Sequence, residues 1–238
     1  MAGQHVFEHR SAAMVHAGRT MAGASNPDSA GGVPDISAEW YRDVVGFAAD
    51  APGWLQGFAA FFTEAALVLL FGFLLLACWR ARRMPARALG IALLGVVGVG
   101  VAYSLSELFK VLVAEERPCR AMQVSTIVAC PPPGDWSFPS NHSVIAGAAA
   151  LGVFAAWRAL GIPALLLGMG TAFSRVFVGA HYPHDVLVGF LFGALVSTVL
   201  VLLLSRTATQ LVEKLPMYRA KPAAVSAAEQ PTVRIPRL

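Results

Sequence analysis

Residues 173–185 read FSRVFVGAHYPHD and lie between two long apolar runs of the chain. The stretch carries an arginine, two histidines and an aspartate, beside segments long enough to cross a bilayer. Ionisable side chains within membrane-spanning segments are costly and are candidates for function by default. Because Pro183 interrupts helical structure here, the stretch predicts a turn between two spans that carries part of a functional site.

The composition indicates a membrane protein. Of the 238 residues, 56% are hydrophobic and 13% are charged, whereas soluble domains have about 25% charged residues. The mean hydropathy is +0.61. Crossing the hydrocarbon core takes about 20 helical residues, and five runs approach or exceed that length: 57–79, 88–113, 143–160, 162–180 and 186–204. They lack the two-residue alternation of a membrane β-barrel. We therefore expect an all-α fold, a polytopic membrane helix bundle with five transmembrane helices.

The remaining sequence predicts three regions. Residues 1–35 are small and polar, which favours a flexible tail over a metal cluster of the three histidines there. No apolar core follows a basic start, so we expect no cleavable signal peptide. Residues 36–54 are too polar to span but contain two tryptophans and a tyrosine, which favours an interfacial helix. We expect residues 36–205 to form the membrane-embedded domain and 206–238 a basic cytoplasmic tail.

The distribution of basic residues predicts the orientation. Four arginines lie within residues 80–87, after the first run, and six lysines and arginines follow the fifth run. Five spans place both groups on one side, which the positive-inside rule assigns to the cytoplasm. The C-terminus is then cytoplasmic and the loop 114–142 lies outside. The net charge of +4 is explained by topology, so we expect no nucleic-acid partner.

Ionisable residues from separate runs fall at the same outer level. They are Lys110, Arg117, His142, Arg175, His181 and Asp185. Lys110 and Arg117 share a face if their helix persists over seven residues, although contacts of both with lipid headgroups are the open alternative. Ser140 stands at the N-cap of the third run, where free N–H groups can hold an anion.

The turn at Pro183 lets Asp185 reach His181 and fix its tautomer, while we expect His184 to point elsewhere. Three cations, a helix N-terminus and a His–Asp pair are typical of a pocket for a phosphate under nucleophilic attack. A transporter site would lie nearer the midplane.

Other side chains leave alternatives open. Glu64 can bind substrate or pair with Arg117, and Glu107, three residues before Lys110, predicts an ion pair with it. We expect Glu115 and Glu116 only to solvate the loop. A disulfide between the two loop cysteines, Cys119 and Cys130, is possible in an oxidising compartment, and sequence leaves it undecided.

Three motifs occur in order: KVLVAEERP at 110–118, PSNH at 139–142 and SRVFVGAHYPHD at 174–185. They resemble KxxxxxxRP, PSGH and SRxxxxxHxxxD, the signatures of the type 2 phosphatidic acid phosphatase superfamily. Asn141 stands where that pattern has glycine. The surrounding spans look most like the bacitracin-resistance branch, the undecaprenyl pyrophosphate phosphatases.

The resemblance implies a role for each matching residue. His181 is the nucleophile, Asp185 orients it, and His142 is the general acid. The residues expected to bind substrate are Lys110, Arg117, Ser140, Asn141, Ser174, Arg175 and Glu64. The implied reaction hydrolyses a membrane lipid, undecaprenyl (polyprenyl) pyrophosphate, through a phosphohistidine on the outer face of the cytoplasmic membrane. We expect no metal or other cofactor, since three cations supply the charge. The alternatives are a phosphatidylglycerophosphate or phosphatidate phosphatase and, without catalysis, a lipid transporter or scramblase.

Overall fold

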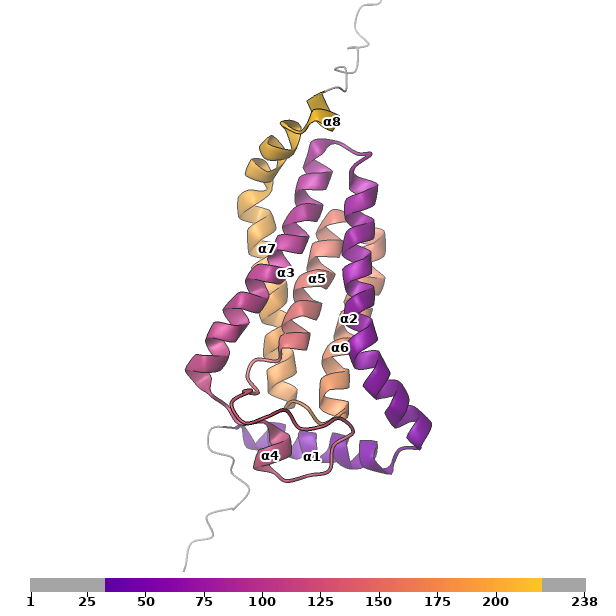
Figure 1. The fold of residues 1–238 in the computed structure, drawn as a ribbon, viewed down its shortest axis with the longest axis vertical. Coiled ribbons are helices and arrows are strands. Elements are labelled where there is room, and N and C mark those ends of the chain that lie inside the picture. The colour runs from indigo at the N-terminus through magenta and orange to yellow at the C-terminus, as the bar shows by residue number, and fades with distance from the viewer. Residues whose placement is uncertain (1–32, 220–238) are drawn as a thin grey trace, which may run out of the picture. The chain divides into compact units, whose positions relative to one another are not determined.

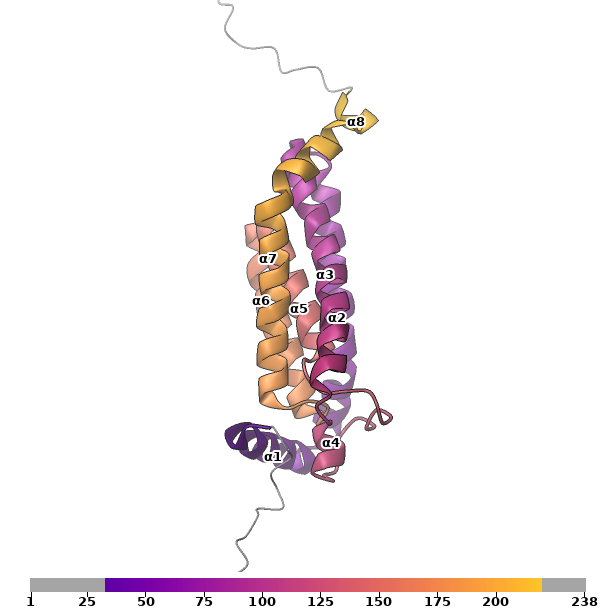
Figure 2. The same ribbon diagram turned by 90° about the vertical axis from the view of Figure 1, so that its left-hand side faces the viewer.

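The structure, a computed structural model, describes residues 33–219, and this part of the chain is helical without β-strands. The described residues form five long helices and a sixth, α1 (Asp35–Asp50); the long helices stand side by side, and α1 lies across one end of them (Figures 1 and 2). The long helices are α2 (Gly53–Ala81), α3 (Ala86–Val113), α5 (Asn141–Ala156), α6 (Arg158–Phe177) and α7 (Pro183–Glu213). α4 (Pro118–Ala121) and α8 (Pro216–Arg219) are single turns.

Within residues 33–219, four helices are long and apolar enough to cross a membrane: α2, α3, α6 and α7. The all-helical membrane fold is thereby confirmed. α5 is apolar but has 16 residues, which rise only about 24 Å. It ends at Ala156, and not at the predicted residue 160, because the backbone of Trp157 is extended (φ −155°, ψ 93°). α6 begins immediately afterwards.

α7 extends to Glu213, well beyond the predicted end at residue 204. Its polar last turns pack on the start of α3, where Gly90 lies so close that an added Cβ would meet the Thr209 nitrogen at 3.1 Å. Val212 is buried in the same contact, against Ala86 and Leu89. Packing against α3 therefore stabilises helical structure that hydropathy alone does not predict.

α5 occupies the middle of the bundle (Figure 1) and is held to α7 by small residues. A Cβ added at Gly193 would lie 1.9 Å from the Val144 carbonyl oxygen, and one added at Gly147 would lie 2.0 Å from that of Phe190. Small residues let membrane helices approach backbone to backbone. This contact fixes two helices that carry functional side chains relative to each other.

α1 confirms the predicted helix near the N-terminus and lies across the end of the bundle (Figure 2). It exposes Trp40 and Phe47 and buries Tyr41, whose hydroxyl donates to the Gly179 carbonyl oxygen at 2.9 Å. The helix is thereby anchored on the turn between α6 and α7.

The segment between α3 and α5 crosses the same end of the bundle as α1 (Figure 1). It contains a disulfide between Cys119 and Cys130, whose Cα atoms lie 5.9 Å apart, so the bridge that sequence left undecided is present. Arg120 Nη1 also donates to the Pro131 carbonyl oxygen. The predicted flexible tail, with its three histidines, lies outside the described residues except for 33–35.

Candidate active site

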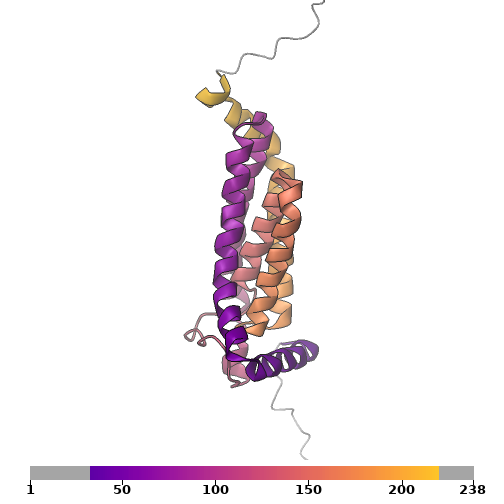
Figure 3. The same cartoon turned by 90° about the vertical axis from the view of Figure 1, so that its right-hand side faces the viewer.

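The charged residues singled out by sequence belong to the end of α3, the 114–140 segment, the start of α5, the end of α6 and the start of α7, and these parts of the chain lie at the end of the bundle that carries α1 (Figures 1 and 3). Seven of the predicted site residues there are at least 92% buried: Lys110, Arg117, Ser140, Ser174, Arg175, His181 and Asp185. Buried ionisable groups persist only when they are paired. The pairings below therefore define the site.

His181 and Asp185 form the first pair, which we call the buried pair. The side chains are 2% and 0% exposed, and Nδ1 of His181 lies 3.4 Å from Oδ2 of Asp185. The same carboxylate oxygen accepts hydrogen bonds from Ser137 Oγ at 2.5 Å and from the Tyr182 nitrogen at 2.9 Å. The carboxylate is thus held in place on the side that faces the imidazole.

The protonation of His181 follows from its neighbours. Nε2 lies 3.1 Å from Nη1 of Arg117, and a guanidinium can only donate. Nε2 therefore carries the lone pair and Nδ1 the proton. Burial lowers the pKa of His181 to about 3, although Asp185 opposes the shift. The imidazole is neutral at physiological pH and presents an unprotonated nitrogen.

The local sequence explains how the buried pair forms. Gly179 has a φ of +84°, a conformation that favours glycine, and it turns the chain after α6. Pro183 opens α7 in its first turn, where the missing N–H is tolerated. Asp185 is the third residue of that helix and caps it through the Tyr182 nitrogen. The predicted turn is confirmed.

Lys110 and Arg117 meet at Asp135 and not on one helix face. α3 ends at Val113, Ala114 is left-handed (φ 50°), and Arg117 is extended, so the helix does not persist to Arg117 and the condition for a shared helix face is not met. Pro118 begins α4 and does not end α3. Arg117 Nη2 lies 2.8 Å and Lys110 Nζ 3.4 Å from Oδ1 of Asp135. Lys110 and Arg117 therefore come together because the 114–140 segment brings Arg117 and Asp135 next to Lys110.

His142 and Glu64 form the second pair, which we call the open pair. His142 Nε2 lies 3.1 Å from Glu64 Oε1, with side chains 23% and 66% exposed. Arg175 Nη1 reaches the same oxygen at 3.3 Å. Glu64 therefore pairs with Arg175 and His142, and the alternative pairing with Arg117 is wrong. Glu107 does pair with Lys110, at 3.9 Å, as predicted.

Arg175 is held by α2, which lies beside α6 (Figure 3). Its Nη1 donates to Thr63 Oγ1 at 3.1 Å, while its buried Nε makes no hydrogen bond within the described residues. Ser174 Oγ donates to the Thr171 carbonyl oxygen at 2.7 Å and lies 3.0 Å from Thr63 Oγ1, whose proton it can accept. Ser174 thus supports the α2–α6 contact, and Arg175 keeps an unused donor.

Ser140 is the N-cap of α5, as predicted, but its side chain makes no capping hydrogen bond. Its backbone nitrogen donates to the Asp185 carbonyl oxygen at 3.2 Å. The Asn141 side chain bridges to α3, accepting from Ser106 Oγ and donating to Glu107 Oε1, both at 2.5 Å. The first turn of a helix leaves backbone N–H groups without intrahelical partners, so this terminus can receive an anion.

Sequence reasoning missed two contributors and misjudged two others. Asp135 and Ser137 lie in the loop without a recognisable pattern. Glu115, expected only to solvate that loop, is 12% exposed and lies 3.2 Å from His184. His184, expected to point elsewhere, has its Nε2 3.2 Å from Oδ1 of Asp185. The partners of Asp135, Ser137 and Glu115 are distant in sequence, where spacing gives no signal, and the direction of the His184 ring is set by contacts with the equally distant Ser37 and Glu115.

Asp135 behaves as an internal anion of the site. Burial disfavours its charged form, but the hydrogen bond and charge of Arg117, together with Lys110, outweigh this and keep its pKa below the ordinary value. Its side chain remains 41% exposed. An exposed carboxylate that neutralises two buried cations marks a position where an anionic ligand would be stabilised.

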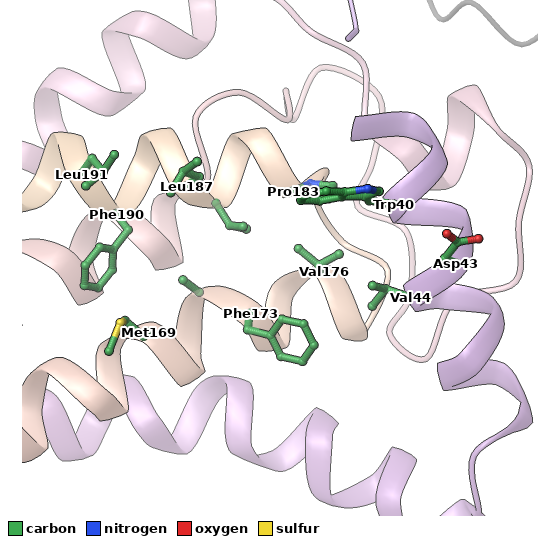
Figure 4. Close-up of a pocket in the computed structure, with 12 residues that line it drawn as sticks. Trp40, Asp43, Val44, Met169, Phe173, Val176, Pro183, Leu187, Phe190 and Leu191 are labelled. Atoms are coloured by element: carbon green, nitrogen blue, oxygen red, sulfur yellow. The ribbon is translucent and has the colours of Figure 1, made fainter. Parts of the chain in front are cut away.

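A mostly apolar cavity lies elsewhere. It has a volume of about 690 Å³ and lies between α1, α6 and α7, lined by apolar side chains and Asp43 (Figure 4). Pro183 and Val186 contribute to its wall, so it lies behind the turn that carries the buried pair. None of the predicted catalytic residues lines it.

The chemistry of these groups suits phosphoryl transfer. A neutral imidazole nitrogen faces an arginine, two further cations lie nearby, and the side chain of a second histidine is partly exposed to solvent. The comparisons agree. A family model described as the PAP2 superfamily matches residues 88–208. The chain belongs to the PAP2 superfamily, and it is a membrane phosphatase of that family.

Curated relatives include phosphatases of polyprenyl lipids. Undecaprenyl-diphosphatase BcrC of Bacillus subtilis is 34% identical over 148 residues, which cover 58% of this chain and 73% of the relative. Decaprenylphosphoryl-5-phosphoribose phosphatase of Mycobacterium tuberculosis is 37% identical over 132 residues, covering 54% and 69%.

One solved structure shares the fold. It is the crystal structure of a transmembrane PAP2 type phosphatidylglycerolphosphate phosphatase from Bacillus subtilis, with a TM-score of 0.54 and 20% identity. The match covers 70% of this chain and 85% of that chain. At this identity the likeness concerns the fold alone.

Proposed function

We propose that this membrane phosphatase hydrolyses a polyprenyl pyrophosphate, with undecaprenyl pyrophosphate as the leading substrate, to the monophosphate and phosphate. The observation that carries the proposal is the convergence of three buried cations, a neutral histidine and a second, solvent-accessible histidine at one end of the bundle. The choice of a polyprenyl substrate is supported by the names of the two curated relatives.

In the proposed first step, His181 Nε2 attacks the terminal phosphorus. A bond forms between nitrogen and phosphorus, and the bond from phosphorus to the bridging oxygen breaks. His142 donates its proton to that leaving oxygen, which remains on the lipid monophosphate. Asp185 stabilises the positive charge on the phosphorylated imidazole through Nδ1–H, the side on which it lies 3.4 Å away.

In the second step, water hydrolyses the phosphohistidine. His142, now neutral, accepts a proton from the water as its oxygen attacks phosphorus, and the nitrogen–phosphorus bond breaks. Free phosphate is released and His181 returns to its neutral form. His142 is suited to exchange protons because its side chain is 23% exposed.

The proposed substrate-binding residues act on the phosphate oxygens. Lys110, Arg117 and Arg175 replace their contacts with Asp135 and Glu64 by contacts with phosphate, and Arg175 Nε supplies an unused donor. Ser140 and the Asn141 amide form the helix N-terminus that faces the phosphate. Ser174 holds α6 against α2 and thereby positions Arg175. Such preorganised charges stabilise the transition state.

We also propose a topology of five spans, in which α5 crosses the membrane together with the four longer apolar helices α2, α3, α6 and α7. α1 then lies at the membrane interface, and the site faces the outer side. Residues 36–205 then form the membrane domain and 206–238 the cytoplasmic tail. The Cys119–Cys130 disulfide supports this orientation, because disulfides persist in oxidising compartments outside the cytoplasm. A reporter protein that is active only in the cytoplasm should be active when it is fused after Leu238. Activity there of a reporter that works only in the periplasm would contradict the topology.

The function is tested by substrate profiling of the purified protein in detergent. Phosphate release is measured from undecaprenyl pyrophosphate, phosphatidylglycerophosphate and phosphatidate, with and without a chelator, and His181→Ala serves as the control. We expect the highest kcat/KM on the polyprenyl pyrophosphate and no effect of the chelator. Preference for either glycerolipid would reassign the substrate. No phosphate from any lipid, with lipid movement unchanged in His181→Ala, would indicate a transporter.

A further inference from the structure

A second polar cluster lies behind the catalytic carboxylate and has no part in the steps above. It consists of Glu115, His184 and the second oxygen of Asp185. Nε2 of His184 is 3.2 Å from Oδ1 of Asp185 and 3.2 Å from Oε2 of Glu115. Thus one oxygen of Asp185 faces His181, and the other faces His184.

The ring of His184 is fixed from three further directions. Ser37 Oγ of α1 lies 2.8 Å from its Nδ1 and accepts a hydrogen bond from its backbone nitrogen at 3.2 Å. Tyr182 stacks on the ring with centroids 5.5 Å apart and an interplanar angle of 22°, and Phe138 does so at 5.8 Å and 25°. An imidazole held in this way has little freedom to rotate.

The hydrogen-bond inventory explains what this ring supplies. Because Ser37 Oγ accepts from the backbone nitrogen of His184, its own proton is free to be donated to Nδ1, which leaves the proton of His184 on Nε2. That N–H lies between the two carboxylates. It donates to Glu115 Oε2 at 3.2 Å and lies 3.2 Å from Asp185 Oδ1, which is buried and accepts no hydrogen bond within residues 33–219. A buried acceptor without a partner is destabilising.

We propose that His184 is a positioning residue that holds Asp185 in register with His181, and that Glu115 in turn orients His184. The proposal rests on the proposed function, because Asp185 matters only if His181 is the nucleophile. Without the His184 ring, Oδ1 loses its 3.2 Å contact with Nε2, and only the hydrogen bonds to Oδ2 from Ser137 and the Tyr182 nitrogen keep the carboxylate in line with Nδ1 of His181. The loss then falls on the chemical step and not on substrate binding.

The test compares His184→Leu with His184→Gln in the undecaprenyl pyrophosphate assay. Leucine fills the space between the two rings without a donor, whereas the glutamine Nε2 can donate close to the position of the imidazole Nε2. We expect His184→Leu to lower kcat by about 10- to 100-fold, as for other groups that orient a functional side chain, with KM unchanged. His184→Gln should recover most of that loss. If His184 only packs between the two rings, His184→Leu should retain a higher kcat than His184→Gln.

Glu115→Gln provides a second variant should His184→Leu fail to fold, which thermal unfolding in detergent will reveal. We expect it to reduce kcat less than His184→Leu and to leave KM unchanged. Wild-type kcat in both Glu115→Gln and His184→Leu would overturn the positioning role. If the wild-type protein itself releases no phosphate, the proposed function fails instead, so the two failures are distinguishable.

Glu115, His184 and Asp185 each offer one atom that could bind a metal ion, and these three atoms lie within 4.8 Å of one another. The test therefore includes metal analysis. The purified protein is assayed for zinc before and after treatment with a chelator. We expect no stoichiometric metal and no change in kcat. Zinc at one equivalent, lost in His184→Gln together with the activity, would overturn positioning by hydrogen bonding and assign the cluster to a metal ion.

Discussion

The buried pair and the open pair contain the same two chemical groups in opposite surroundings. His181 and Asp185 are 2% and 0% exposed, and one tight turn supplies both residues. His142 and Glu64 are 23% and 66% exposed and come from two different helices, α5 and α2. Burial fixes a tautomer and an orientation, which a nucleophile needs. Exposure permits exchange of protons with water, which a general acid and base needs.

The largest effect is expected from the buried pair. Asp185→Asn retains the shape of the side chain but cannot stabilise a charged imidazole, so kcat should fall on the order of 10⁴-fold, as in the equivalent change of Ser-His-Asp triads. His181→Asn should lose at least as much. Phosphate release in detergent measures both. A loss of tenfold or less in Asp185→Asn would remove the distinction between the two pairs.

His142→Gln should reduce kcat by about 10²- to 10⁴-fold, the usual contribution of general acid–base catalysis. The loss should shrink on an aryl phosphate with a good leaving group, because that leaving group needs no proton. The comparison uses p-nitrophenyl phosphate and the lipid substrate side by side. An equal loss on both substrates would assign His142 to binding instead of proton transfer.

Glu64→Gln should have a smaller effect, roughly tenfold on kcat. Glutamine still contacts His142 and Arg175 but removes a charge that water already screens at 66% exposure. Steady-state kinetics at several salt concentrations will measure it. If the loss equals that of Asp185→Asn, the open pair is as dependent on its carboxylate as the buried pair, and the comparison fails.

The smallest expected effect is on stability. Burial lowers the pKa of His181 to about 3, whereas the unfolded chain titrates at about 6.5. Between these values the unfolded state binds a proton that the folded state does not, so stability falls as pH falls. Thermal unfolding in detergent between pH 7.5 and 4.5 should show a shallower decline in His181→Gln, by up to about 1.4 kcal/mol per pH unit. The same dependence of stability on pH in the wild type and in His181→Gln would contradict this prediction.

Hydropathy and motif spacing predicted much of this molecule. The apolar runs located α2, α3, α6 and α7, because a spanning helix must be apolar over most of its length. The end of α5 was missed because Trp157 breaks the helix without a glycine or proline. The long end of α7 was missed because it depends on packing against α3.

The site shows the same division. His181, Asp185 and the cations stand at fixed spacings that a sequence displays. Asp135 reaches Arg117 across 18 residues, and Glu115 reaches His184 across 69. Those contacts depend on the path of the 114–140 segment, which carries no periodic pattern. Loop geometry therefore decides which carboxylates join the site.

The carboxylate of Asp135 has one more consequence. Because it is covalently tethered beside Arg117 and Lys110, it acts as a built-in competitor at an effective concentration of roughly millimolar or higher. To remain bound, the inorganic phosphate produced in each turnover must displace the Asp135 carboxylate from Arg117 and Lys110. A lipid substrate is concentrated in the bilayer and so has the advantage, which biases the enzyme toward release of its product and against inhibition by it.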